Sequence, residues 1–149
     1  MAKHEVSASA VIHAPASQVY AVIADYRDGH PRILPKPYFV DLKIDEGGIG
    51  AGTVITFRMK LMGGIQTFHA AITEPEPGRI LVETDLDRGA VTTFTVEPCD
   101  DGRHANVTIT TVTDVRRGIL GRIEGWLTTR LLQPIYVKEL AQLDTTVMR

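Results

Sequence analysis

Several features that would point directly to a function are scarce or missing in this sequence. Its 149 residues include one cysteine, Cys99, so the chain cannot form an internal disulfide. Lys and Arg total 16 against 18 Asp and Glu, a formal net charge of -2, whereas proteins that bind nucleic acid present a basic surface. No uninterrupted apolar run reaches the ~18 residues of a membrane span, and residues 1–5 lack the apolar stretch of a signal peptide. We therefore expect a cytoplasmic protein with no nucleic-acid partner and no stable membrane insertion.

The signatures of metal and nucleotide chemistry are missing as well. The histidines contain no pair at i,i+4 spacing and no H-E-x-x-H motif. The glycine-rich stretch 47–52 matches neither the P-loop nor G-x-G-x-x-G, and it precedes a strand pattern, so we interpret it as a hairpin turn. No nucleophile elbow or carboxylate pair at catalytic spacing is present either. We predict no metal site and no cofactor.

What remains is the composition of an ordinary globular protein. Apolar residues make up 44% of the chain and charged residues 23%. A chain of this length can bury a substantial core. With no linker, repeat or low-complexity segment in view, we expect one domain over residues 1–149.

The order of hydrophobic patterns predicts strands followed by one long helix. Residues 6–13 suit a strand, residues 15–25 suit a short helix beginning near Pro15, and residues 27–37 can hold a turn or a second short helix. Alternating apolar residues with turn signals every ten or so residues then predict about six antiparallel strands. Their expected ranges are 38–44, 55–61, 68–72, 79–85, 92–97 and 105–111, with a turn over 74–78.

The closing helix, expected over residues 116–146, carries two apolar stripes that point in different directions. The first contains Ile119, Ile123, Trp126 and Leu127, and the second contains Leu132, Tyr136, Leu140, Leu143 and Val147. On a straight helix the two stripes could not face the same sheet. Pro134 lies near the join, and an internal proline bends a helix. We predict a bent helix whose halves pack on different parts of the fold.

This order resembles the helix-grip fold of the START-like (SRPBCC) superfamily, especially its polyketide cyclase/dehydrase-like bacterial branch. The resemblance rests on the stretches 12–26, 48–53 and 96–108 and on Leu131-Leu132-Gln133-Pro134 in the final helix. It implies an α+β fold in which a curved antiparallel sheet of about seven strands wraps around a long C-terminal helix, with two short helices after the first strand. Because this fold hosts binding proteins and enzymes alike, it does not specify the function.

The inward-facing positions predict an apolar cavity with a few uncharged polar groups. We expect the binding of a hydrophobic small molecule such as a lipid, isoprenoid or polyketide, whose burial would supply most of the affinity. The candidate ligand-binding residues are Tyr38, Ile55, Phe57, Met59, Phe68, Thr92, Phe94, Ile109, Thr111, Ile123 and Leu127.

Two alternatives stay open. A cyclase/dehydrase-like enzyme would need a titratable group in the pocket, for which Asp25, His30, Tyr38 and Glu83 are the candidates. A membrane-surface or protein-interaction module would use the first apolar stripe of the last helix together with Arg116, Arg117 and Arg122. The catalytic residues of any enzyme, the oligomeric state and the ligand are not determined by the sequence.

Overall fold

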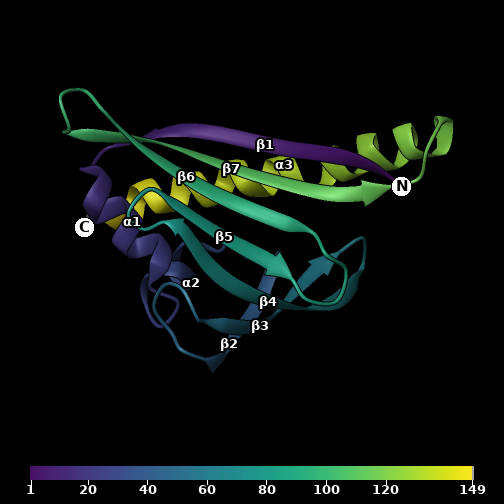
Figure 1. Ribbon diagram of the computed structural model, residues 1–149, viewed down its shortest axis with the longest axis horizontal. Coiled ribbons are helices and arrows are strands. Elements are labelled where there is room, and N and C mark those ends of the chain that lie inside the picture. The colour runs from purple at the N-terminus through teal and green to yellow at the C-terminus, as the bar shows by residue number, and fades with distance from the viewer. Residues whose placement is uncertain (149) are drawn as a thin grey trace.

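The computed structural model describes residues 1–148, which form a seven-stranded sheet and three helices (Figure 1). In chain order the elements are β1 (Ala2–Ile12), α1 (Ala16–Ala24), α2 (Gly29–Ile33), β2 (Phe39–Glu46), β3 (Val54–Leu61), β4 (Gly64–Glu76), β5 (Ile80–Asp85), β6 (Val91–Cys99), β7 (His104–Val115) and α3 (Ile119–Val147). The α+β helix-grip fold inferred from the sequence is confirmed.

The sheet is an antiparallel meander with its first strand returned to the far edge. The strand order is β1-β7-β6-β5-β4-β3-β2, and every neighbouring pair is antiparallel. Several sequence-based bounds differ from those observed. β1 begins at Ala2 because its polar start pairs with Val115 at the end of β7. β4 continues to Glu76, so that the turn expected over 74–78 is confined to residues 77–79, and Pro75 lies at a register shift between Thr73 and Glu76.

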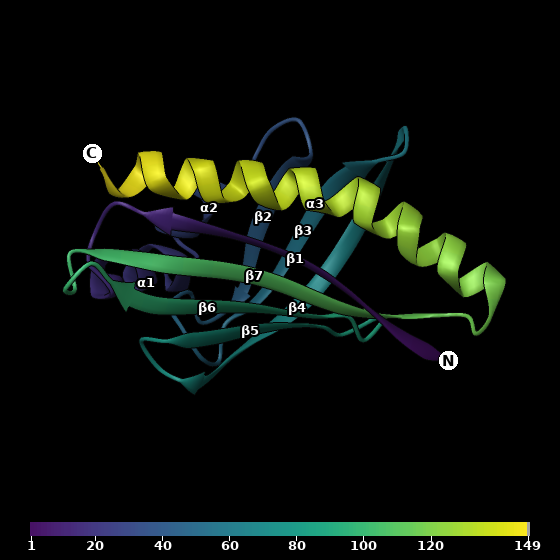
Figure 2. The ribbon, with the colours of Figure 1, turned by 90° about the horizontal axis from the view of Figure 1, so that it is seen from above.

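The long helix α3 crosses the concave face of the sheet, nearest to β1 (Figure 2). One contiguous hydrophobic core lies between this helix, the sheet and the two short helices. Its largest fully buried side chains come from every layer: Tyr26, Phe94, Ile12, Ile23, Ile33, Ile55, Ile72, Leu81, Ile109, Ile135, Leu140 and Leu143.

The two halves of α3 have different surroundings, as their two apolar stripes predicted. In the second half Ile135, Leu140 and Leu143 are at most 2% exposed. The apolar residues of the first stripe are instead largely in solvent, from Ile123 at 49% exposed to Ile119 at 75%. Figure 2 shows the helix axis changing direction near its middle, and Pro134 lies near the middle of the helix in the sequence.

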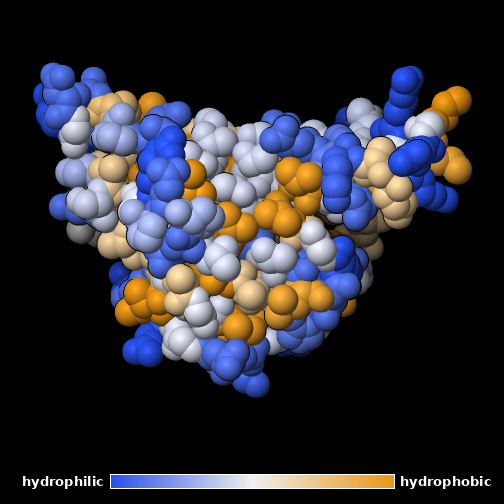
Figure 3. All heavy atoms as spheres, viewed as in Figure 1, coloured by the Kyte–Doolittle hydropathy of each residue, from blue (hydrophilic) through white to orange (hydrophobic). Residues whose placement is uncertain are grey.

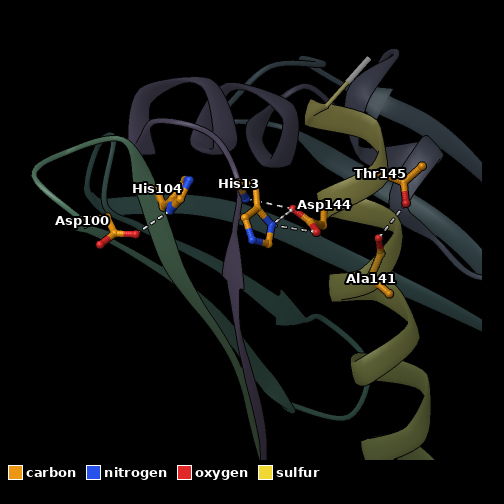
Figure 4. Close-up of polar contacts among 6 residues, drawn as sticks. All are labelled: His13, Asp100, His104, Ala141, Asp144 and Thr145. Carbon is orange, nitrogen blue, oxygen red and sulfur yellow. Dashed lines mark hydrogen bonds and ion pairs between the residues drawn. The ribbon is translucent and has the colours of Figure 1, made fainter.

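Polar contacts attach the second half of α3 to the strands. Asp144 accepts hydrogen bonds from the backbone amide of His13 at 2.8 Å and from its ring Nδ1 at 3.0 Å (Figure 4). The Tyr136 hydroxyl meets the hydroxyl of Thr111 on β7 at 2.5 Å. In the first half, the glycines Gly121 and Gly125 face inward, where a Cβ would meet the Arg116 carbonyl and the His4 ring. The first half therefore packs through backbone, and the second through large side chains.

Candidate functional site

A cavity in two adjoining parts lies between α3 and the concave face of the sheet. The outer part has a volume of ≈ 320 Å³ and the inner part ≈ 70 Å³. They adjoin because both are lined by Phe57, Met59, Glu83, Thr92, Leu132 and Tyr136. The exposed residues Gln66, Arg88 and Asp114 lie at the outer part, so this part opens to solvent. Most other lining residues are apolar, as is usual for small-molecule sites.

The inner part ends at a buried histidine. His30 on α2 is 2% exposed, and its Nδ1 lies 2.7 Å from the carbonyl oxygen of Ile23, so Nδ1 carries a proton and donates it. Its ring stacks on Tyr26 at a centroid distance of 4.3 Å. Burial lowers the pKa of His30 despite the opposing effects of the Glu83 charge and the Ile23 bond. In the neutral ring, Nε2 is an acceptor that lies 3.5 Å from Oε2 of Glu83.

Glu83 is held by a tyrosine that a glycine turn positions. The fully buried Tyr26 donates its hydroxyl proton to Oε2 of Glu83 at 2.5 Å. Burial and the adjacent Glu83 charge raise the pKa of Tyr26 well above its ordinary value, so the phenol keeps its proton. The backbone amide of Tyr26 donates to the carbonyl of Gly48 at 2.8 Å. The glycine-rich turn thus supports the site through the backbone and does not line the cavity.

A second carboxyl group enters the inner part from α3. Glu139 is 3% exposed and lines the inner part of the cavity. Burial first, and then the charge of Glu83, raise the pKa of Glu139 well above its usual value. The shift favours the protonated form of this group, which as a carboxylic acid can donate one hydrogen bond and accept others.

Hydroxyl groups form a short chain beside these carboxyl groups. Thr92 bonds Thr111 at 2.8 Å, and Thr111 bonds Tyr136. Burial raises the pKa of Tyr136 to about 12, so it too remains a neutral hydrogen-bonding group. The inner cavity therefore combines a carboxyl group, an imidazole base and the phenol of Tyr136 with no cationic side chain among its lining residues.

The structure brings most of the predicted ligand-binding residues together. Those that line the cavity are Ile55, Phe57, Met59, Phe68, Thr92, Phe94 and Thr111. Ile109 is buried in the core without lining either part, and Tyr38 lies outside, where its hydroxyl accepts from Lys138 at 3.3 Å. A ligand-binding role for the seven lining residues stays a prediction.

Two expectations about the cavity require correction. Ile123 and Leu127 do not line it, because they lie on the outward face of α3, while Glu124 and Thr128 lie on the inward face. The assumption that the cavity wall is uncharged is also wrong. The inward face of β5 could not be assigned from its sequence, and it carries Glu83, while Glu139 lies among the buried apolar residues of α3.

The other sequence candidates have simpler places in the structure. Asp25 accepts hydrogen bonds from the backbone amides of Arg27 and Asp28 and stabilises the turn after α1, outside the cavity. Within residues 1–148 no group of His, Cys, Asp and Glu is arranged to hold a metal ion. Of the candidates for acid–base chemistry, His30 and Glu83 reach the cavity.

Solved structures with this fold include enzymes and proteins without a stated activity. The KanY protein is 25% identical over the full length of both chains, with a TM-score of 0.85. The Zhui aromatase/cyclase from Streptomyces sp. R1128 is 18% identical over 99% of this chain and 95% of its own, with a TM-score of 0.80. Norcoclaurine synthase from Thalictrum flavum, in complex with dopamine and hydroxybenzaldehyde, is 13% identical over 99% and 87%, with a TM-score of 0.74. The latter two likenesses establish a shared fold alone.

At the sequence level, no curated protein matches significantly. No helix in residues 1–148 is long and apolar enough to cross a bilayer. The family model described as polyketide cyclase/dehydrase and lipid transport, however, matches residues 3–148, which is nearly the whole chain. Together with the helix-grip architecture and its apolar cavity, this match places the chain in the polyketide cyclase/dehydrase and lipid transport family of the START-like superfamily.

Proposed function

We propose that the protein binds a largely apolar small molecule, such as a lipid, isoprenoid or polyketide, in the cavity between α3 and the sheet, and that it does so in the cytoplasm. The cavity itself carries the proposal. Its outer part of ≈ 320 Å³ falls in the size range of small-molecule sites, and its walls are mainly aliphatic and aromatic. The family description, which names both cyclases and lipid transport, agrees with this class of ligand.

The inner residues support a ligand with a hydrogen-bonding group at its leading end. His30 Nε2 and Glu83 Oε2 are neighbouring acceptors 3.5 Å apart, so a hydroxyl or amine beside them would find partners. The Glu139 acid can donate to a carbonyl oxygen. The Glu83 charge would repel a carboxylate ligand, and the inner part has no cationic side chain to offset that repulsion. We therefore favour neutral or cationic ligands over fatty acids.

Displacement of a fluorescent probe tests this proposal. The probe is N-phenyl-1-naphthylamine, which is neutral, apolar and carries one N–H donor. Ala70 is 4% exposed and lines the outer part, so Ala70→Phe would fill it. We expect this variant to weaken probe binding roughly tenfold or more.

The control variant is Ala71→Phe, because the next residue of β4 points to the opposite face of the sheet. It should leave probe binding within about twofold of the parent protein. Circular dichroism checks that both variants fold. Equal probe binding by the parent and Ala70→Phe would overturn the cavity as the binding site.

A second candidate function is acid–base catalysis on a carbonyl substrate. The observation that favours it is the pairing of a buried acid, Glu139, with a neutral imidazole, His30, at the same end of the cavity. The base would remove a proton next to the carbonyl while the acid donates to the carbonyl oxygen, which is the first step of an aldol-type cyclisation.

Proton exchange in a model ketone tests this second function. We expect the protein to accelerate exchange of the α-protons of 2-tetralone in D2O, followed by NMR. Glu139→Gln should lower the rate by roughly a hundredfold, since Gln cannot donate a carboxylic proton. No acceleration over a buffer containing free imidazole would exclude this function while leaving the binding proposal intact.

A further inference from the structure

The first half of α3 turns its apolar side away from the protein. Ile119 is 75% exposed, Leu120 56%, Ile123 49%, Trp126 58% and Leu127 52%. Their spacing of three and four places them along one face of the helix. Single exposed apolar residues are ordinary, but a contiguous apolar face generally marks an interaction site. We call these five residues the outer stripe.

The packing of this half explains why the outer stripe cannot simply turn inward. Gly121 and Gly125 hold the opposite face close to the fold, since a Cβ at Gly121 would lie 1.5 Å from the Arg116 carbonyl oxygen. His4 of β1 fills the space beside Gly125, and its Nε2 forms a 2.8 Å hydrogen bond with Thr129. The small inward residues and the large outward ones together fix the orientation of the helix.

The charges around the outer stripe have one predominant sign. Residues 116–133 include four arginines, Arg116, Arg117, Arg122 and Arg130, and one acidic residue, Glu124. All four arginines are exposed, and the guanidinium of Arg130 lies over the Trp126 ring at 5.0 Å. The whole chain is nevertheless net negative, at -2. Figure 3 shows the apolar and charged side chains side by side on the projecting end that Figure 1 identifies as the start of α3.

This surface also adjoins the mouth of the cavity. Glu124 and Thr128, which line the outer part, lie one residue from Ile123 and Leu127 of the outer stripe. Two strand turns carry further exposed apolar residues next to lining ones. Met62, 85% exposed, follows the lining residue Leu61, and Leu86, 57% exposed, follows Asp85. Apolar side chains thus project from three elements around one opening.

We propose that the first half of α3 docks on the surface of an anionic lipid bilayer. Trp, Ile and Leu on one helical face with flanking arginines are the composition of helices that lie in the membrane interface. Apolar burial and attraction of arginines to acidic lipid headgroups would both contribute to binding. Docking in this orientation brings the cavity mouth to the membrane, where an apolar ligand could enter or leave. The docking surface is defined by α3 alone and does not depend on what the cavity holds.

Vesicle binding by the purified full chain tests the proposal. Trp126 is the single tryptophan, so its fluorescence reports directly on the proposed contact. We expect a blue shift and co-sedimentation with vesicles of phosphatidylglycerol and phosphatidylcholine in equal amounts. Binding should weaken as salt is added, because exposed charges are screened. Replacing Arg117 and Arg122 with Gln should cost roughly fivefold in partitioning for each charge.

A matched pair of substitutions separates the outer stripe from general surface hydrophobicity. Leu127→Ser should lower partitioning roughly tenfold, because the leucine loses its contact with acyl chains. Val137→Ser in the second half of the same helix should leave it unchanged. The two parent residues are 52% and 55% exposed, so neither substitution should prevent folding.

Three outcomes would overturn the proposal. One is no partitioning of the parent protein into anionic vesicles, and another is equal loss in Leu127→Ser and Val137→Ser. The third is a combination of two results: no vesicle binding, and a dimer in sedimentation equilibrium that Leu127→Ser dissociates. This combination would assign the outer stripe to contact with a second copy of this chain. Probe binding in the cavity is measured in solution, so its result tests the proposed ligand binding independently of membrane docking.

Discussion

The two halves of α3 are similar in apolar content and opposite in surroundings. In the second half Ile135, Leu140 and Leu143 fill the core, and Glu139 reaches the inner cavity. In the first half glycine and threonine face the sheet, and the large apolar residues face solvent. An apolar stripe on a helix therefore identifies a contact face but not the partner that covers it. The partner depends on what the opposite face can pack against.

The largest expected difference between the halves is in core packing. Leu140→Ala should lower the free energy of unfolding by about 2–5 kcal/mol, since the leucine side chain is only 2% exposed and its truncation leaves a cavity in the core. Leu127→Ala should cost less than about 1 kcal/mol, because this side chain already lies half in solvent. Urea denaturation followed by circular dichroism measures both. Similar losses in the two variants would contradict the proposed difference.

The second prediction compares two glutamates, one in each half. Burial raises the folded-state pKa of Glu139 above its unfolded value, so the native state keeps a proton that the unfolded chain releases. Stability should therefore be unaffected by this group below about pH 4.5 and should fall as pH rises toward the folded pKa. The slope contributed by one proton is about 1.4 kcal/mol per pH unit. Glu139→Gln should remove this slope and make the protein more stable than the parent at neutral pH.

Glu124 serves as the control with the opposite sign. The backbone amide and then the guanidinium of Arg116 hold the pKa of Glu124 below its ordinary value. Its contribution is present at neutral pH and is lost as pH falls through the folded pKa. Glu124→Gln should thus leave the slope above pH 5 unchanged. Urea titrations at several pH values give the free energy of unfolding and its slope with pH for each variant. If Glu139→Gln has the same slope as the parent, the pKa of Glu139 is not raised in the folded state.

The third prediction concerns the backbone packing of the first half. A methyl group at Gly121 would collide with the backbone oxygen of Arg116, whereas one at Gly125 would meet the side chain of His4, which can rotate away. Gly121→Ala should therefore cost about 1–3 kcal/mol and Gly125→Ala less. Hydrogen exchange should show faster amide exchange in the first turns of α3 in Gly121→Ala. The same protection in both variants would count against tight backbone packing there.

The sequence was sufficient for the architecture because its signals are local. Period-two alternation, glycine turns and one long helical pattern each follow from short-range rules, and their order was enough to infer the helix-grip fold. The turn expected over 74–78 begins only at residue 77, because β4 tolerates Pro75 at a register shift near its end. Strand pairing overrode a local turn signal at this point.

The site was only partly predictable, and the misses share a cause. Phe57, Met59 and Thr92 were placed correctly because their strands alternate clearly. Glu83 lies on a strand whose apolar and polar residues do not alternate, and Glu139 has the appearance of an ordinary surface glutamate in its helix. Only the tertiary arrangement shows that both carboxyl groups share one inner cavity. Ile123 and Leu127 were assigned inward because glycine packing cannot be seen in a hydrophobic pattern.

The smallest predicted effects come from one cation–aromatic contact in each half. Arg130 lies over Trp126 at 5.0 Å within the same helix, and Lys138 lies over Tyr38 at 4.9 Å, which joins α3 to the segment before β2. Exposed contacts of this kind contribute about 0.5–1 kcal/mol. Lys138→Gln should lose up to about that amount, because it also removes a 3.3 Å hydrogen bond to the Tyr38 hydroxyl between distant segments.

Arg130→Gln should change the free energy of unfolding by less than about 0.5 kcal/mol. The contact of Arg130 with Trp126 joins residues four apart in the same helix, so it does not connect the helix to another part of the fold. The same substitution removes one positive charge from beside the outer stripe. It should therefore weaken partitioning into anionic vesicles while leaving the urea midpoint almost unchanged, and Lys138→Gln should do the reverse. Such a crossed result would separate residues that stabilise the fold from residues that serve its surface. A parallel loss of stability and partitioning in both variants would show that the first half of α3 is simply a less well packed continuation of the second.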